Sequence, residues 1–172
     1  DAVRGRSPGG ELDDSLMPVI TFASTHYMAV TGADYLQIRG LNIIGERNGA
    51  LVHVQTGAVV DGSVCTNSST GSSAVGILAA VGTTSVLNCD VTMSSGHASS
   101  IGISSVGTVM YNRVNMPASG IGIAITNNNG KPVAFNTVID GTTGIAKLTT
   151  GAEFTCFSNT IYGCSGDGID IV

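Results

Sequence analysis

Residues 133–148 read VAFNTVIDGTTGIAKL and contain the pattern that decides the fold of this chain. A short run with β-branched residues, 133–138, is followed by an Asp-Gly turn and by a second short run, 144–148. Short runs between turn residues indicate strands, and the 3.6-residue apolar spacing of an amphipathic helix is absent throughout the chain. Because strands this short cannot bury a face alone, the pattern predicts that they pair with further copies of the same unit.

The unit recurs with a period of about 23 to 24 residues, which three independent markers share. The first marker is a Gly-Ile pair that begins at Gly76, Gly102, Gly122, Gly144 and Gly168, with Ala50-Leu51 in the equivalent earlier place. The second is a turn glycine at Gly57, Gly82, Gly107, Gly130 and Gly151. The third is an aliphatic column of Leu41, Val64, Val91, Val114, Val138 and Ile161.

A period of this length divides into three short strands with turns between them, and repeats stacked in register build one continuous core. The sequence therefore predicts an all-β fold: a right-handed parallel β-helix (solenoid) of about seven rungs over residues 18–172. The hand follows from the rule for parallel crossover connections. Residues 1–17 are interpreted as an irregular N-terminal arm that includes Asp13-Asp14.

Polar residues lie at a constant offset, two positions before the aliphatic column. The offset is occupied by Asn112, Asn136 and Asn159, and in the earlier repeats by Cys89, Gly62 and Arg39. Side-chain amides stacked about 4.8 Å apart can hydrogen-bond from rung to rung. We therefore interpret the three asparagines as a structural ladder.

The composition limits the classes of function. The 172 residues include 7 Lys+Arg against 12 Asp+Glu without a basic cluster, which argues against nucleic acid as a partner. No run of 18 apolar residues occurs, so no membrane span is expected. The four cysteines, at 65, 89, 156 and 164, form no CxxC motif, and free thiols are expected rather than a zinc site. Asn67-Ser68-Ser69 matches a glycosylation sequon, as chance alone allows in a chain rich in Ser and Thr.

Residues 30–45, VTGADYLQIRGLNIIG, resemble the opening rungs of right-handed parallel β-helix proteins of the pectate-lyase-like superfamily, of the phage tailspike and virion type. The later Asn-Thr-Val and Gly-Ile phrases resemble its ordinary repeats, so the resemblance covers about residues 18–172. It implies a fold more than an activity. The superfamily includes polysaccharide lyases, glycoside hydrolases, tailspikes, virion adhesins and non-enzymatic rods.

The motifs of the superfamily's enzymes are largely missing. Its hydrolases commonly carry paired Asp residues, a Gly-His-Gly turn and an Arg-x-Lys phrase, whereas here Ala98 follows Gly96-His97. A glycosidase needs two carboxylates about 5 to 9.5 Å apart, and a calcium-assisted lyase needs clustered acidic ligands. The weak candidates for a catalytic carboxylate are Asp61, Asp90, Asp140 and Asp167.

Each candidate also has a structural interpretation. Asn88 follows Asp61 on the next rung, and Arg113 follows Asp90, which places opposite charges side by side. Near the end of the chain, Asp167 and Asp170 could approach Asp140 on the preceding rung and otherwise are solvated turn residues. The histidines share no column; they are His26, His53 and His97. Neither a metal site nor a cofactor is expected.

Contacts with partners are expected at aromatic and apolar positions. The candidates for contacts with sugar rings are Tyr35, Tyr111 and Tyr162. The phenylalanines are interpreted as core or coil-stacking residues, namely Phe135, Phe154 and Phe157. Apolar residues next to the inward columns suggest a face covered by another chain, namely Val59, Val86, Val109 and Val133. With no cap sequence after Val172, we expect a homo-oligomer, with a trimer as the favoured state, or a longer rod that covers Ile169 and Ile171.

On these grounds the sequence favours a non-catalytic structural or adhesin-like β-helix, as in a tailspike, tail fibre or decoration protein that binds surface glycans. The expected location is a virion or the extracellular space. Two alternatives stay open: a fragment of a polysaccharide lyase or glycoside hydrolase, and an extracellular spacer or fibre module.

Overall fold

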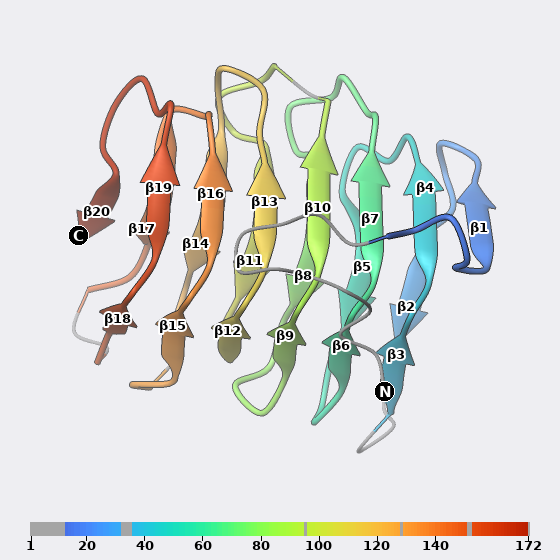
Figure 1. Ribbon diagram of the computed structural model, residues 1–172, viewed down its shortest axis with the longest axis horizontal. Helices are drawn as coiled ribbons and strands as arrows, with labels where there is room; N and C mark the ends of the chain where they lie inside the picture. The colour runs from blue at the N-terminus through green and yellow to red at the C-terminus, as the bar shows by residue number, and fades with distance from the viewer. Residues whose placement is uncertain (1–12, 32–35, 95, 128, 151–152, 172) are drawn as a thin grey trace.

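The computed structural model describes residues 13–31, 36–94, 96–127, 129–150 and 153–171, which form strands and turns without a helix. Their twenty strands form three sheets, A, B and C (Figure 1). Sheet A consists of β1 (Val19–Phe22), β4 (Asn42–Gly45), β7 (Val64–Asn67), β10 (Asp90–Met93), β13 (Arg113–Asn115), β16 (Thr137–Ile139) and β19 (Thr160–Tyr162). Sheet B consists of β2 (Met28–Val30), β5 (Ala50–Val54), β8 (Val75–Ala79), β11 (Ile101–Ser105), β14 (Ile121–Ile125), β17 (Thr143–Lys147) and β20 (Ile169–Ile171). Sheet C consists of β3 (Gln37–Arg39), β6 (Val59–Asp61), β9 (Ser85–Leu87), β12 (Thr108–Met110), β15 (Pro132–Ala134) and β18 (Thr155–Phe157).

Successive strands enter different sheets, and each strand pairs in parallel with the strand three places further along the chain. The chain therefore coils about six times around a single core, and Figure 1 shows the coils side by side along the long axis of the molecule. This arrangement confirms the all-β parallel solenoid, and the number of turns is close to the seven rungs expected.

The inward column of sheet A shows where the expected register is right and where it is wrong. Its last four members pair in the expected order, Val91, Val114, Val138 and Ile161. The two earlier members are wrong, because Cys65 pairs with Val91 and Ile43 pairs with Cys65. Cysteine packs as a small apolar residue, so it takes the inward place while Val64 faces outward and Leu41 lies in the preceding turn.

Sheet C supplies a second inward column, whose members are Ile38, Val60, Val86, Val109 and Val133. The expectation that Val86, Val109 and Val133 belong to an outer face covered by another chain is therefore wrong, since their own chain buries them. Val59 is half-buried beside the inward Val60. The high apolar content follows from a core with three sides.

Four of the Gly-Ile pairs lie in strands of sheet B, where their glycines face side chains of sheet A. A Cβ on Gly122 would overlap Cγ1 of Val138 and would lie 2.7 Å from the carbonyl oxygen of Gly144. The same crowding by a sheet A side chain and a backbone oxygen occurs at Gly76, Gly102 and Gly144. Only glycine fits such a close approach, which explains its recurrence at this place in the coil.

In β5, the pair that corresponds to Gly76-Ile77 is Leu51-Val52 rather than the expected Ala50-Leu51. Val52 pairs with Ile77, and Ala50 pairs with Val75. Leu51 is fully buried where the later coils have glycine. The space for it comes from Gly45, whose Cβ, if present, would lie 2.6 Å from Cδ1 of Leu51. In this early contact the large residue is in sheet B and the glycine is in sheet A, which is the reverse of the later coils.

The turn from sheet C to sheet A places a residue with positive φ on successive coils. The φ angle is 57° at Gly62, 52° at Asn88, 60° at Tyr111 and 57° at Phe135. This left-handed conformation costs a residue with a Cβ about 1–2 kcal/mol and is uncommon for bulky side chains. The surrounding structure must therefore hold Tyr111 and Phe135 in place.

The next residue of the same turn forms a hydrogen-bonded ladder inside the molecule. Nδ2 of Asn112 donates to Oδ1 of Asn136 at 3.0 Å, and Nδ2 of Asn136 donates to Oδ1 of Asn159 at 3.0 Å. The backbone N–H groups of Asn112 and Asn136 donate to the same oxygens. Each amide thus ties its turn to the neighbouring coil.

The ladder position is occupied by Cys89 as expected and differs from the expectation in the two coils before it. The backbone N–H of Cys89 donates to Oδ1 of Asn112 at 2.9 Å, and that of Leu41 donates to Oγ of Ser63 at 3.3 Å. Cys89, Ser63 and Leu41 therefore occupy the position, whereas Gly62 and Arg39 lie outside it. This correction follows directly from the shifted register of the first two coils.

The four cysteines are free thiols, as expected; Cys65 and Cys89 are buried, and Cys156 and Cys164 are half-buried. Burial raises the pKa of Cys65 far above its ordinary value, and the neighbouring Cys89 raises it further. The Cys65 thiol is therefore held in the neutral form.

The sequon asparagine, Asn67, is 0% exposed. Its Nδ2 donates to the carbonyl oxygens of Arg47 and Val75, and its Oδ1 accepts the backbone N–H of Arg47. An amide that is fully buried and used in this way cannot receive a glycan in the folded chain. The sequon is a structural part of the turn between sheets A and B.

The last coil leaves two residues of the sheet B columns in solvent. Ile169 and Ile171 are 48% and 63% exposed, whereas Ile145, which pairs with Ile169, is buried. Within the described ranges, no helix has the length and apolar character needed to cross a bilayer.

Candidate functional site

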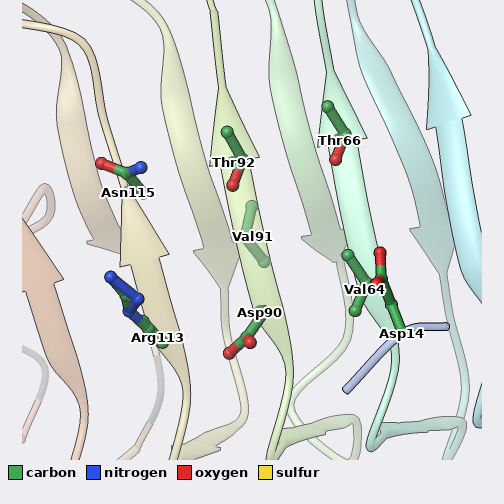
Figure 2. A pocket seen from close by; sticks show the side chains of 8 residues that line it. All are labelled: Asp14, Val64, Thr66, Asp90, Val91, Thr92, Arg113 and Asn115. Atoms are coloured by element: carbon green, nitrogen blue, oxygen red, sulfur yellow. The ribbon is translucent and has the colours of Figure 1, made fainter. Parts of the chain in front are cut away.

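A polar trough lies on the outer face of sheet A, across β7, β10 and β13 (Figure 2). Its volume is about 230 Å³, below the ~300–1,000 Å³ of pockets for drug-sized ligands. Side chains alternate along a strand, so the residues on either side of the inward column face outward. The lining residues are Asp14, Val64, Thr66, Asp90, Val91, Thr92, Arg113 and Asn115.

Two outward columns form the floor of the trough and extend beyond it along the sheet. The first column runs Asn42, Val64, Asp90, Arg113, Thr137 and Thr160. The second column runs Ile44, Thr66, Thr92, Asn115, Ile139 and Tyr162. Adjacent members of a column lie about 4.8 Å apart, so the face presents regularly spaced side chains, most of which can form hydrogen bonds.

Asp14 closes one side of the trough from the segment that precedes β1. Its Oδ2 accepts a hydrogen bond from Nδ2 of Asn42 at 2.9 Å, and its carbonyl oxygen accepts the backbone N–H of Met17 at 3.0 Å. Met17 is buried, so the segment is held both at Asp14 and three residues later. The expected irregular arm therefore contributes a carboxylate to the face of the solenoid.

Asp90 and Arg113 lie opposite each other on β10 and β13, in the centre of the trough. Asp90 is only 8% exposed. The pair offers a hydrogen-bond acceptor beside a donor, on strands that fix their separation. The remaining polar lining residues can accept or donate hydrogen bonds through their hydroxyl and amide groups; they are Thr66, Thr92 and Asn115.

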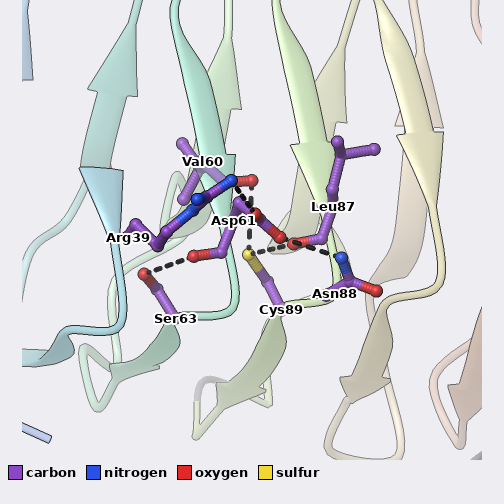
Figure 3. Close-up of polar contacts among 7 residues, drawn as sticks. All are labelled: Arg39, Val60, Asp61, Ser63, Leu87, Asn88 and Cys89. Atoms are coloured by element: carbon purple, nitrogen blue, oxygen red, sulfur yellow. Dashed lines mark hydrogen bonds and ion pairs between the residues drawn. The ribbon is translucent and has the colours of Figure 1, made fainter. Parts of the chain in front are cut away.

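Asp61 lies elsewhere, at the end of β6 in sheet C, where the chain turns toward sheet A (Figure 3). Oδ2 of Asp61 forms an ion pair with Nη2 of Arg39 at 2.7 Å. Oδ1 of Asp61 accepts a hydrogen bond from Nδ2 of Asn88 at 2.8 Å. Both carboxylate oxygens are thus engaged by residues from the coils on either side. The arrangement ties three successive coils together at this turn.

Asp140 and Asp167 lie in turns between sheets A and B. The carbonyl oxygen of Asp140 accepts a hydrogen bond from the Cys164 thiol, and that of Asp167 accepts the backbone N–H of Gly144. Burial raises the pKa of Cys164, and the Asp140 carboxylate raises it further. Of the four acidic candidates, only Asp90 lines the trough.

Among the described residues, no group of three or more His, Cys, Asp or Glu side chains lies together so that it could hold a metal ion. The histidines with described structure lie on separate coils. They are His26 before β2, His53 on β5 and His97 in the turn after β10.

Three aromatic side chains stack from coil to coil beside the asparagine ladder. The rings of Tyr111 and Phe135 lie 5.1 Å apart at an angle of 5°, and those of Phe135 and Phe157 lie 5.5 Å apart at 85°. The coil-stacking interpretation of Phe135 and Phe157 is confirmed. Phe135 covers one face of the Tyr111 ring, although Tyr111 is still 47% exposed; Tyr162, at the end of the second outward column, is 52% exposed.

Tyr35 lies outside the described residues, and Phe154 packs against the core. Of the trough residues, Thr66, Thr92 and Asn115 were missed from the sequence, although strand alternation around Val91 and Val114 would have identified an outward row. Asp14 has no sequence signal, because its place depends on how the segment before β1 folds back.

The comparisons with known proteins returned no matching family model, curated protein or solved structure.

Proposed function

We propose that the chain is a non-catalytic, adhesin-like β-helix whose polar trough binds a surface glycan. The observation that carries this proposal is the grid of carboxylate, guanidinium, amide and hydroxyl groups in the trough. Sugar hydroxyls both donate and accept hydrogen bonds, so they match such a grid better than an apolar ligand does. Because the groups stand on paired strands, their spacing is rigid and little ordering entropy is lost on binding.

A virion or cell-surface setting fits this proposal, because a rod with a binding face on its side serves attachment. Ile169 and Ile171 would be covered when such rods assemble, and we propose a homo-oligomer, with a trimer as the favoured state. Sedimentation velocity of wild type and Ile171→Lys tests the assembly. We expect the substitution to weaken the oligomer, since a desolvated charge costs several kcal/mol. A wild-type monomer at every concentration would contradict the assembly.

A second candidate function, cleavage of a polysaccharide, is favoured by one observation. Asp14 and Asp90 line the same trough, and pairs of carboxylates catalyse glycoside hydrolysis when their separation suits the mechanism. Reducing-end release and absorbance of unsaturated products from neutral and acidic polysaccharides test this candidate. Turnover that disappears in both Asp14→Asn and Asp90→Asn would replace the non-catalytic proposal.

A glycan array probed with the labelled protein tests the proposed function. We expect Arg113→Gln to remove binding, because it takes away the central donor of the trough, and Thr160→Ala to leave binding unchanged. Thr160 stands in the same outward column but lines no part of the trough. Equal binding by both variants, or no binding by the wild type, would contradict the proposal and favour the spacer module.

A further inference from the structure

We infer that Asn129 is a site of spontaneous deamidation, a covalent modification that converts its side-chain amide to a carboxylate through reaction with the backbone of Gly130. The inference is independent of the proposed function. It rests on a comparison of two Asn-Gly pairs, Asn129-Gly130 and Asn48-Gly49, which share the same dipeptide but have different surroundings. Asparagine is one of the chemically labile residues of proteins, so the surroundings decide how long each pair lasts.

The reaction needs an asparagine side chain that can reach the next backbone nitrogen. The Gly130 nitrogen attacks Cγ of Asn129, so an N–Cγ bond forms, the Cγ–Nδ2 bond breaks, and ammonia leaves with the proton of the Gly130 N–H group. Water then opens the resulting cyclic imide. Cleavage of the N–Cγ bond gives aspartate at position 129, and cleavage of the bond to the main-chain carbonyl carbon gives isoaspartate. Glycine favours the attack because no Cβ shields its nitrogen.

The Asn129 side chain is exposed in the turn between β14 and β15. Its carboxamide makes no hydrogen bond to any residue that the structure describes. The φ angles of Asn129 and Gly130 are 47° and 74°, as in a tight turn. The Gly130 N–H donates to the carbonyl oxygen of Glu153 at 3.2 Å. Glu153 is also exposed, so local opening of this surface hydrogen bond is enough to free the nitrogen.

The Asn48 side chain, in contrast, is held against the next coil. Its Oδ1 accepts the backbone N–H of Ser73 at 2.9 Å. A Cβ on Gly71 would overlap Cγ of Asn48, so the carboxamide packs directly against that backbone. The Gly49 carbonyl oxygen accepts the backbone N–H of Val75 at 2.9 Å, which fixes the glycine as well. The Asn48 side chain must leave these contacts to reach the Gly49 nitrogen, so the fold should protect it.

The product places a new negative charge beside an existing one. The Glu153 carboxylate lies against Gly130, since a Cβ on this glycine would be 2.8 Å from Oε2 of Glu153. Deamidation of Asn129 also makes the formal charge of −5 more negative by one unit. The modified chain should therefore separate from the original one as an acidic form in ion-exchange chromatography.

The experiment follows both asparagines in the same folded protein. The wild-type chain is incubated in mildly alkaline water enriched in heavy oxygen, which marks only those residues that are hydrolysed during the incubation. Peptide mapping by mass spectrometry, with electron-transfer fragmentation, then measures aspartate and isoaspartate at positions 48 and 129. We expect Asn129 to react at least about tenfold faster than Asn48. In the urea-denatured chain the two rates should agree within about threefold, because the contacts of Asn48 are lost.

Asn129→Gln is the matched variant, because it keeps an exposed amide while the longer side chain forms the cyclic imide far less readily. We expect Asn129→Gln to remove the acidic form and Asn127→Gln, a change at another exposed asparagine of the same turn, to leave it unchanged. Circular dichroism of each variant confirms that it is folded. A ratio of native rates below about tenfold, or an acidic form that persists in Asn129→Gln, would overturn the inference.

Discussion

The early coils, up to β9, and the late coils, from β12 onward, have the same path but hold it with different chemistry. At the turn from sheet C to sheet A, the late coils use stacked Asn side chains inside and stacked aromatic rings outside. The early coils use Cys89 and Ser63 inside, and the ion pair of Arg39 with Asp61 outside.

The contact between sheets A and B differs in the same way. From β8 onward, glycines such as Gly122 give room to an aliphatic side chain of sheet A, whereas in the coil of β5 Leu51 fills the space left by Gly45. The comparison teaches that the coil geometry does not require one set of residues. It requires that each turn satisfies its backbone groups and that each contact keeps its total volume.

The largest expected effect comes from breaking the ladder in the late coils. Asn136→Ala removes the acceptor of two buried donors of Asn112 and the donor to the carbonyl oxygen of Val109. Each buried group left without a partner costs about 1–3 kcal/mol, so we expect a loss of about 3 kcal/mol or more in unfolding free energy. Urea denaturation measures it.

The matched change in the early coils is Ser63→Ala, which removes a single acceptor at 3.3 Å from the Leu41 backbone N–H. We expect a loss of about 1 kcal/mol. Equal losses of unfolding free energy for Asn136→Ala and Ser63→Ala would show that this turn is held equally strongly in the early and the late coils.

The glycine contact of the late coils should also be intolerant. Gly122→Ala forces a methyl group against Val138 and a backbone oxygen, and overpacking of this kind costs about 1–3 kcal/mol. Gly168→Ala is the control, because a Cβ there meets no atom within 4 Å. Thermal unfolding should give a clearly lower Tm for Gly122→Ala and an unchanged Tm for Gly168→Ala; a fall of the same size in both would contradict the steric explanation.

The buried thiol of Cys65 should make the stability of the chain sensitive to alkali. Both states keep Cys65 protonated below the ordinary thiol pKa of 9.0, so its contribution to stability is fully present there. Above that pH the unfolded thiol ionises while the buried one does not, and the unfolding free energy falls by about 1.4 kcal/mol per pH unit. Urea denaturation between pH 8 and roughly pH 10 measures the slope, which Cys65→Ala should reduce; an unchanged slope would contradict this assignment.

The smallest effect is expected from extending the ladder by one coil. Sγ of Cys89 approaches the carbonyl oxygen of Val60 at 3.6 Å, just as Nδ2 of Asn112 donates to that of Val86 at 2.9 Å. We expect Cys89→Asn to change the unfolding free energy by no more than about 1 kcal/mol, because the amide finds the same partners. A loss as large as that of Asn136→Ala would show that the early turn cannot accept the chemistry of the late one.

The sequence predicted the fold best where the repeats are strict. Val91, Val114, Val138 and Ile161 were placed correctly because β-branched residues alternate with polar ones at a steady period. It failed at Val64 and Leu41, where Cys65 takes the inward place and a valine faces outward. Burial of one apolar residue rather than its neighbour is decided by the pairing with the next coil, which a local pattern does not contain.

The sequence by itself determined that the chain coils in parallel, because short strands with a common period have no other way to bury their faces. The tertiary structure alone decided the candidate site. The repeat predicted that Asp90 and Arg113 are neighbours. Asp14 joins them in the trough only because the segment before β1 folds back onto sheet A and accepts a hydrogen bond from Asn42. The line from Thr66 to Tyr162 likewise arises only when separate coils are stacked at the strand spacing, because residues that are distant in the chain then become neighbours on one face.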